Sequence, residues 1–479
     1  MDDGEYFVAA QSLRDGEGYR LPSRPGTPPE LKYPPGLSLI AAQILPRGPT
    51  TLQSDFRAVR LIAVLAGLVY AVTSFATLRL LKVSGIVAAS CLVPAMFNET
   101  CLTQSLTLLS DVPFAACCTS AALVWAMLRS GKIAAALWLA PMLGIVAGAA
   151  ITLRSNGVAL FFACIALAWV APKRLRFLAG YLLTASLLPV LARLATQTTA
   201  STAPSEPYSV NWIAYSSVEA GAEVLLGNAL SYFCAVPNLF VPVLSTNVFA
   251  RHPILTLAIR ILVWLVIIRG TWPLARLGLQ RVDAAPALFA ALTLAICLIW
   301  PWPLYLRILI PFMPFLIALA IAGLRVGNEP RFPLAAIGIL GTLAATAVQF
   351  TITVRALRNP PAALDEAFEF IRASTEADAV LVTQLPETTF VYTGRQAVKA
   401  LSDADHVSKN FGNWSSIDAW ARVAAGRPFY LLGPPVVQRA TDPLAQHISA
   451  LAFSASHHLD ELYRSPLGEL AVFRITGVR

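Results

Sequence analysis

Residues 58–80 read AVRLIAVLAGLVYAVTSFATLRL, and this stretch decides the class of fold. It is almost free of charge, and it has the length of about 20 apolar residues that an α-helix needs to cross a bilayer. Apolar stretches of similar length recur up to Val354. The chain of 479 residues is 56% hydrophobic and only 13% charged, whereas soluble domains are about 25% charged. The sequence therefore predicts a polytopic membrane protein that is mainly helical.

The apolar stretches predict about ten membrane spans. We place them at residues 58–80, 84–98, 107–128, 132–152, 155–171, 175–195, 253–270, 284–300, 305–324 and 332–354. An even number of spans puts both ends of the chain on the same side of the membrane.

The basic residues between the spans predict the orientation, because Lys and Arg collect in cytoplasmic loops. With the N-terminus outside, the cytoplasmic loops hold Lys82, Arg129, Lys132, Lys173, Arg174, Arg176, Arg276, Arg281, Arg325 and Arg331. The net charge of +9 is therefore a sign of membrane topology, and we expect no nucleic-acid partner.

Three regions follow from this topology. We expect an extracytoplasmic segment at residues 1–56, a transmembrane domain at 57–355 with an outer loop at 196–252, and an extracytoplasmic domain at 356–479. The predicted fold is thus mainly α, a polytopic helical bundle that carries a small α/β domain at its C-terminal end.

Local patterns predict the elements of the N-terminal segment. Apolar residues at helical spacing predict a helix over residues 5–14, which Gly16 and Gly18 can end. The Pro- and Gly-rich residues 17–35 predict a loop, and the apolar residues 37–45 predict a short helix that lies at the membrane surface.

The C-terminal tail alternates between helical and strand patterns. Residues 363–373 predict a helix, and residues 379–383, 429–432 and 470–475 predict strands.

Charged residues in membrane spans are costly and commonly mark functional sites. Asp111, Arg154 and Arg307 each lie near the predicted outer end of a span, and Glu99 lies in an outer loop. Lys32 follows an acidic cluster at the N-terminus. We expect these groups to converge on one face, where a carboxylate can deprotonate or orient an acceptor and cations can hold a phosphate leaving group.

Each of these charges also has a purely structural interpretation. The two N-terminal aspartates can cap a helix, and Asp111 can pair inside the bundle. Arg154 and Arg307 can extend to the lipid headgroups, while Lys32 and Glu99 can be solvated loop charges.

The histidines and cysteines form no recognisable site. None of the seven cysteines stands in a C-x-x-C pair, none of the five histidines stands in an H-E-x-x-H motif, and no G-x-x-x-x-G-K-[ST] loop occurs. We therefore expect neither a resident metal nor a cofactor, although dependence on a divalent metal stays open.

Several short motifs occur in an order that agrees with the predicted topology. They are Asp2-Asp3-Gly4-Glu5-Tyr6, Lys32-Tyr33-Pro34-Pro35-Gly36, Ser110-Asp111-Val112-Pro113-Phe114, Thr152-Leu153-Arg154-Ser155-Asn156-Gly157, Arg307 through Pro314, and Tyr392-Thr393-Gly394-Arg395. This set resembles the GT-C glycosyltransferases. The most similar branch is that of the protein O-mannosyltransferases (the dolichyl-phosphate-mannose–protein mannosyltransferase family) and the lipid A aminoarabinose transferase.

The resemblance implies roles for the candidate residues. Asp2 would be the catalytic carboxylate, and Asp3 and Asp111 would assist it or shape the acceptor site. Lys32, Arg154 and Arg307 would bind the lipid phosphate. Tyr6 and Glu99 complete the set of expected substrate-binding residues.

The resemblance also implies a reaction. The chain would transfer a sugar from a polyprenyl-phosphate donor, with inversion, to a lipid, glycan or protein acceptor on the extracytoplasmic face. We expect it to be an integral protein of the bacterial inner (plasma) membrane that acts in the cell envelope.

One departure and two rival functions remain open. Proteins of this group have a transmembrane helix before the loop with which this chain begins, so either the start is misassigned or the helix is missing. The rival functions are a transporter or flippase of lipid-linked sugars, whose charges should lie at the bilayer midplane, and a degenerate relative without catalysis.

Overall fold

The computed structural model contains two compact units. The helical unit comprises Val59–Ala195 and Ala222–Arg358, and the α/β unit comprises Met1–Ala58, Thr196–Gly221 and Asn359–Arg479. The structure describes residues 3–46, 52–97, 100–101, 109–129, 136–169, 174–196, 217–238, 240, 252–277, 294–295, 298, 305–323, 340, 343–344, 346–348, 350–351, 362–400, 422–424, 426–434, 458–466 and 469–476.

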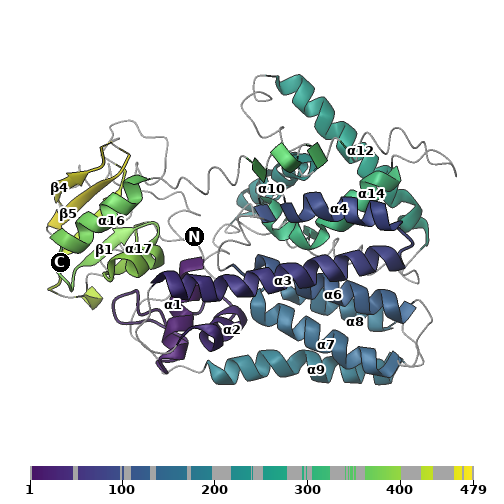
Figure 1. The fold of residues 1–479 in the computed structure, drawn as a ribbon, viewed down its shortest axis with the longest axis horizontal. Helices are drawn as coiled ribbons and strands as arrows, with labels where there is room; N and C mark the ends of the chain where they lie inside the picture. The colour runs from purple at the N-terminus through teal and green to yellow at the C-terminus, as the bar shows by residue number, and fades with distance from the viewer. Residues whose placement is uncertain are drawn as a thin grey trace. The chain divides into compact units, whose positions relative to one another are not determined.

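Helices make up the described part of the helical unit (Figure 1). They are α3 (Leu52–Leu80, whose first residues belong to the α/β unit), α4 (Gly85–Phe97), α6 (Asp111–Arg129), α7 (Ala136–Leu153), α8 (Gly157–Trp169), α9 (Arg174–Ala195), α10 (Val218–Asn238), α12 (Pro253–Leu277), the 3-10 helix η3 (Tyr305–Phe312) and α14 (Met313–Gly323).

Most of the predicted spans coincide with these helices. Among the described residues, Arg57–Leu80, Asp111–Leu128 and Arg176–Ala195 are long and apolar enough to cross a membrane. Shorter apolar helices lie at Gly85–Phe97, Trp138–Leu153, Gly157–Ala166 and Leu309–Ala318. The helical unit thus has the helices of an integral membrane protein. The predicted spans at 284–300 and 332–354 fall largely outside the described residues.

Helix α10 is a feature that the sequence analysis did not anticipate. It lies within residues 196–252, for which we expected an outer loop, and it runs for 21 residues. Its first turns carry Glu219 and Glu223, which lower the hydropathy of the stretch, but its later turns bury Tyr232 and Val236 in the core of the helical unit. Packing of one face therefore makes this stretch helical although it is too polar to stand out as a span.

Helices α7 and α9 approach each other closely at two glycines of α7. A Cβ atom on Gly148 would lie 2.7 Å from the carbonyl oxygen of Ala185 on α9, and one on Gly144 would lie 3.0 Å from the Ala185 nitrogen. Small residues four positions apart let two membrane helices bring their backbones together, and dispersion forces then hold the pair. Around this contact lie the buried side chains of Leu143, Ala147 and Tyr181.

The α/β unit contains a five-stranded sheet of order β2-β1-β3-β5-β4. The strands are β1 (Val380–Thr383), β2 (Gln396–Lys399), β3 (Phe429–Gly433), β4 (His458–Arg464) and β5 (Ala471–Thr476). Strand β1 pairs in parallel with β2 and β3, whereas β5 pairs antiparallel with β3 and β4. The strands at 379–383, 429–432 and 470–475 were predicted; β2 and β4 were not.

Two helices accompany the sheet. Helix α16 (Ala362–Ser374), which was predicted over residues 363–373, buries Phe368 and Ile371 against one face of the sheet. Helix α17 (Pro386–Thr393) follows β1, and Gly394 ends it in the left-handed conformation with φ of 72°. The other face of the sheet buries a second cluster of apolar side chains that includes Leu431 and Phe473.

The N-terminal segment folds onto this C-terminal domain within the same unit. Helix α1 (Asp3–Arg14) contacts both α2 (Gly36–Ile44) and α17. Both helices were predicted, and Gly16 and Gly18 adopt positive φ after α1 as expected of glycines that end a helix. Val8 and Ala9 of α1 share one apolar cluster with Phe390 of α17.

Substitution of Gly148 by Ala tests the α7–α9 contact. We expect Gly148→Ala to lower the free energy of unfolding by about 1–3 kcal/mol, because the added methyl group meets backbone that must move. The measurement is thermal unfolding of the purified chain in detergent.

Gly227→Ala is the matched control, since a Cβ atom there meets nothing within 4 Å. It should raise stability by about 0.5–1 kcal/mol because glycine is unfavourable within a helix. A Gly148→Ala variant as stable as Gly227→Ala would contradict the close packing.

Candidate functional site

The first candidate site is a cluster of three charges in the helical unit. Asp111 is buried, and its side chain has 0% exposure. Arg307 donates to it twice, from Nη2 to Oδ2 at 3.1 Å and from Nε to Oδ1 at 3.4 Å. Arg154 also donates from Nη1 to Oδ1. Two guanidinium groups thus share one carboxylate.

Each of the three residues lies at the end of a helical element. Asp111 begins α6, Arg154 follows the last residue of α7, and Arg307 lies in the first turn of η3. The turn after Arg154 requires a small residue, because a Cβ atom on Gly157 would collide with the backbone of Ala150. The sequence therefore brings charges from three distant segments to one point.

The neighbouring helix α3 fixes η3 in place. The hydroxyl of Tyr70, which is fully buried, donates to the carbonyl of Ile310 at 2.7 Å. Ile310 itself is buried at 0% exposure in the apolar cluster that also holds Leu78 and Met313. The guanidinium of Arg307 keeps partial access to solvent, since its side chain is 29% exposed, against 11% for Arg154.

The structure therefore brings together three of the residues singled out in the sequence. The arginines face Asp111, so their charges are not simply extended to lipid headgroups. Asp111 is paired inside the bundle, and such a pairing sets the positions of both guanidinium groups. The catalytic and binding roles assigned to these residues stay predictions.

The second candidate site lies in the α/β unit, between the N-terminal segment and helix α17. Arg24 donates from Nη2 to Oε1 of Glu5 at 2.8 Å and to Oε1 of Glu387 at 2.8 Å, and from Nε to Glu387 at 3.1 Å. The three side chains have exposures of only 4–5%. One buried guanidinium thus joins α1, the following loop and α17.

Lys32 lies close to this network on a sharp turn. The backbone amides of Lys32 and Tyr33 donate to Oε1 of buried Glu30 at 2.5 and 3.0 Å. The Nζ of Lys32 stands 5.1 Å from the centre of the Tyr33 ring, and that ring lies 5.0 Å from the ring of Tyr6. Tyr6 is itself buried at 3% exposure, so it packs against the turn that carries Lys32.

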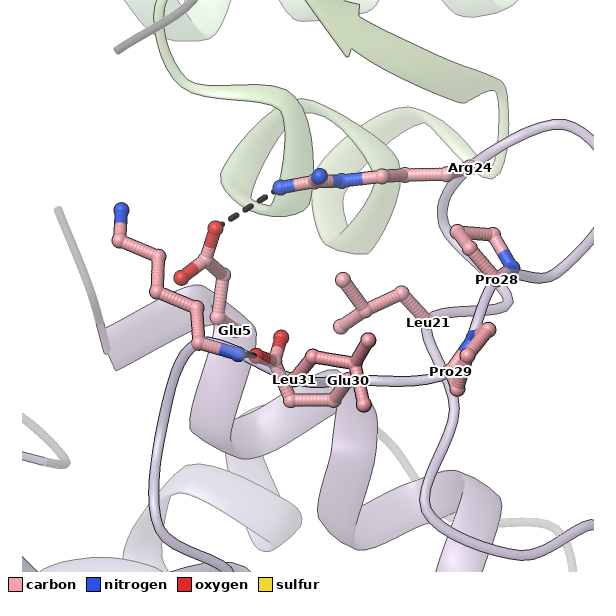
Figure 2. A pocket seen from close by; sticks show the side chains of 8 residues that line it. Glu5, Leu21, Arg24, Pro28, Pro29, Glu30 and Leu31 are labelled. Atoms are coloured by element: carbon pink, nitrogen blue, oxygen red, sulfur yellow. Dashed lines mark hydrogen bonds and ion pairs between the residues drawn. The ribbon is translucent and has the colours of Figure 1, made fainter. Parts of the chain in front are cut away.

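A small pocket opens among these residues (Figure 2). It is lined by Glu5, Leu21, Arg24, Pro28, Pro29, Glu30, Leu31 and Lys32. Its volume of about 10 Å³ is near the smallest that can hold a water molecule. The second carboxyl oxygen of Glu5, Oε2, is buried without a hydrogen-bond partner in the structure. Such an atom calls for a proton donor or acceptor in the pocket.

The pKa of Glu5 is raised to about 8, chiefly by burial and then by the neighbouring charge of Glu387, while Lys32 and Lys399 oppose the shift. The pKa of Glu30 is raised as well, first by burial, against the lowering effect of Arg24 and of the two backbone amides. Arg24 cannot neutralise two buried carboxylates. Glu5 is therefore the group that holds a proton at neutral pH.

The remaining predicted site residues are placed as follows. Asp3 is the first residue of α1, and its side chain lies outside the described part of the chain, as do Asp2 and Glu99. Lys32 and Tyr6 belong to the α/β unit, whereas the Asp111 cluster belongs to the helical unit. The convergence of all these residues on one face therefore stays a prediction.

Sequence reasoning missed Arg24 and Glu387, and it treated Glu5 only as part of a motif. Glu387 follows Pro386, and proline is favoured in the first turn of a helix. The proline indicates where a helix begins, but it does not indicate that Glu387 pairs with Arg24, which lies 363 positions away. Within the described residues, no group of three or more His, Cys, Asp or Glu side chains could hold a metal ion.

Comparisons with known proteins extend this description. No protein-family model and no curated protein matches the chain in sequence. Solved structures do match in fold. One is ArnT from Cupriavidus metallidurans bound to undecaprenyl phosphate, with a TM-score of 0.54 and 14% identity over 99% of this chain and 93% of that one.

Two further matches are structures of the oligosaccharyltransferase AglB of Archaeoglobus fulgidus. The complex with zinc and sulfate has a TM-score of 0.57 and 14% identity over 99% of this chain and 69% of that one. The complex with an inhibitory peptide and dolichol-phosphate has a TM-score of 0.51 and 11% identity over 98% of this chain and 70% of that one. The chain thus shares the fold of these structures, which agrees with the mainly helical fold with a small C-terminal α/β domain that the sequence predicted.

Removing the charge of Asp111 tests the first cluster. We expect Asp111→Asn to destabilise the chain by about 3–5 kcal/mol, because it leaves buried guanidinium charge uncompensated. Arg154→Gln should cost more than Arg307→Gln, since Arg307 is the more exposed partner and is better screened by solvent. Thermal unfolding in detergent measures all three.

Asp365→Asn, at an exposed carboxylate of α16, serves as the control and should change stability by less than about 0.5 kcal/mol. Equal effects of Asp111→Asn and Asp365→Asn would show that the buried cluster is not formed.

The raised pKa of Glu5 predicts how stability depends on pH. The unfolded chain releases this proton near pH 4.5 and the folded chain only near pH 8, so the folded state binds more protons in between. The α/β unit should therefore lose stability as the pH rises from about 4.5 to about 8, and Glu5→Gln should flatten this slope.

Denaturant unfolding at a series of pH values makes the measurement, with Glu369→Gln at an exposed position as the control that keeps the wild-type slope. A Glu5→Gln variant with an unchanged slope would refute the assignment.

Proposed function

We propose that this chain is an integral membrane glycosyltransferase that transfers a sugar from a polyprenyl-phosphate donor to an acceptor on the extracytoplasmic face. The observation that carries the proposal is the pairing of Arg154 and Arg307 around Asp111, which brings two guanidinium groups together at the ends of three helical elements. A guanidinium fork matches the geometry of a phosphate, and Arg307 keeps enough exposure to meet a ligand.

The fold supports the choice of reaction. The ArnT structure matched above holds undecaprenyl phosphate, and one of the AglB structures holds dolichol-phosphate. In this chain, the candidate phosphate-binding cations are Lys32, Arg154 and Arg307. By this proposal Asp111 acts on the reaction by holding the two arginines, because its side chain is fully buried between them.

The proposed chemistry is a single displacement. The carboxylate of Asp2, assisted by Asp3, accepts the proton of the acceptor hydroxyl or amine as that oxygen or nitrogen attacks the anomeric carbon. The bond between the anomeric carbon and the phosphate oxygen breaks, and its electron pair leaves with the polyprenyl phosphate. The cations offset the charge that develops on this leaving group. One displacement inverts the anomeric configuration.

The proposed topology follows from the distribution of basic residues. The N-terminal segment and the C-terminal domain would face the outside of a bacterial inner membrane, where lipid-linked sugars and their acceptors meet.

The decisive test is transfer by the full chain in membranes with a panel of radiolabelled polyprenyl-phosphate sugars. We expect transfer from at least one donor, a loss of more than about 100-fold for Asp2→Asn, and a rise in donor KM or a fall in kcat of about 10–100-fold for Arg307→Gln and Lys32→Gln. Arg372→Gln, at an exposed cation of α16, should leave the rate unchanged.

No transfer from any donor by the well-inserted chain would reject the proposal. Uptake or flipping of labelled lipid without transfer would point to a transporter instead, and equal activity of wild type and Asp2→Asn would remove Asp2 from the mechanism.

A further inference from the structure

We propose that Arg24 and Glu387 are positioning residues, through which the C-terminal domain fixes helix α1 and the acidic residues at its start. The inference rests on the proposed function for its catalytic consequence but not for the contact itself. Nothing in the sequence motifs assigned a role to either residue.

The contacts of Arg24 join three segments of the α/β unit. Arg24 reaches both carboxylates with Nη2 at 2.8 Å and adds a third contact from Nε to Glu387 at 3.1 Å. All three side chains are excluded from solvent. Removing one partner from such a buried set leaves an uncompensated charge, which is far costlier than breaking an exposed pair. The bridge therefore holds α1, the loop and α17 in one arrangement.

The loop around Arg24 is itself attached to the sheet. The amide of Ala397 on β2 donates to the carbonyl of Ser23 at 2.7 Å. The side-chain amide of Gln396 donates to the carbonyls of Pro22 and Arg24 at 3.0 and 3.1 Å. Arg427 in turn donates to the oxygen of that amide at 2.7 Å. The C-terminal domain thus holds the backbone from which the side chain of Arg24 extends.

Helix α1 also approaches α17 closely at Gly4. A Cβ atom on Gly4 would lie 2.7 Å from Cβ of Glu387 and 3.1 Å from the amide nitrogen of Thr388. Asp3 immediately precedes Gly4 in the chain. A displacement of α17 by one ångström must therefore displace the first turn of α1 by a similar amount. Glycine at this position admits the contact, and the ion pairs stabilise it.

The charges around Glu5 explain why the contact between α1 and α17 depends on Arg24. Glu5 is faced by Glu387 from α17, by Arg24, Glu30 and Lys32 from the loop, and by Lys399 from β2. The aromatic hydroxyl of Tyr19 is also near. Because Glu5 holds a proton at neutral pH, loss of Arg24 leaves the buried carboxylate of Glu387 without its guanidinium and removes the hydrogen bond from Arg24 to Glu5. The start of α1 would then move away from α17.

Loss of Arg24 should change kcat and donor KM differently from a general loss of folded protein. A misplacement of about one ångström at a reacting group can lower the rate 100-fold, whereas Arg154 and Arg307 remain in the helical unit to bind the donor. Loss of Arg24 should therefore lower kcat by a larger factor than it raises donor KM, since Lys32 on the same loop keeps its charge. A lysine in place of Arg24 keeps the charge but loses the fork that spans two carboxylates, so it should give an intermediate rate.

The experiment uses the full chain in lipid nanodiscs and two readouts. The first is donor kcat and KM, and the second is hydrogen exchange of the amides in α1 and α17. We expect Arg24→Gln to lower kcat at least tenfold and to raise donor KM by a smaller factor. Exchange should become faster in α1 and α17 and stay unchanged in α7 and α9, while Arg24→Lys should lie between wild type and Arg24→Gln.

Two further variants show whether a fall in kcat comes from the loss of this contact or from poor folding of the Arg24→Gln variant. Gly4→Ala changes no charge and favours the helix, yet it separates α1 from α17, so it should reproduce the fall in kcat even if Arg24→Gln folds poorly. Arg464→Gln removes an arginine from an exposed pair with Glu461, whose two side chains are 53% and 34% exposed, and should change neither readout.

The readouts separate the two proposals. Unchanged exchange in α1 for both Arg24→Gln and Gly4→Ala would overturn the positioning role, as would kcat values within twofold of wild type for both. If the wild type transfers no sugar while exchange in α1 rises as expected, the docking of α1 stands and the proposed function falls.

Discussion

A charge that is removed from water must find a partner, and this constraint organises both units of the chain. In the helical unit, Asp111 is fully buried and two arginines from distant segments meet on it. In the α/β unit the arrangement is reversed, since one buried cation, Arg24, is shared by the carboxyl groups of Glu5 and Glu387. Both clusters are far costlier to break than surface ion pairs, so they fix the relative positions of the elements that supply them.

Packing and backbone contacts fix the positions of the charged side chains in both clusters. The glycines of α7 let α9 approach closely, and the hydroxyl of Tyr70 anchors η3 on α3, so the arginines approach Asp111 from fixed directions. In the α/β unit, the sheet holds the backbone of Ser23 and thereby aims Arg24. The two sites thus use ordinary packing to hold charges that would otherwise be solvated. A phosphate-binding function draws on the same property, because prearranged cations need no reorganisation when a charged ligand arrives.

Much of the fold follows from the sequence, and particular residues show why the rest does not. The apolar spans and helix α16 are visible because burial imposes a regular pattern on them. Strand β4 was missed because it is an edge strand in which Asp460 and Glu461 are exposed, so it shows no apolar pattern. Helix α17 was missed because its 8 residues are too few for helical periodicity. Asp111, Arg154 and Arg307 were found because charge in an apolar stretch is conspicuous, whereas the pair of Arg24 with Glu387 joins two polar segments and leaves no local signal.

Equilibrium binding can show whether Arg154 and Arg307 bind a lipid phosphate, as we propose. The measurement is the affinity of purified chain for radiolabelled polyprenyl phosphate without a sugar, compared between wild type, Arg307→Gln and Arg372→Gln. We expect saturable binding that Arg307→Gln weakens about 10-fold or more and that Arg372→Gln, at an exposed position, leaves unchanged. Equal affinities for all three chains, or no saturable binding by the wild type, would contradict it.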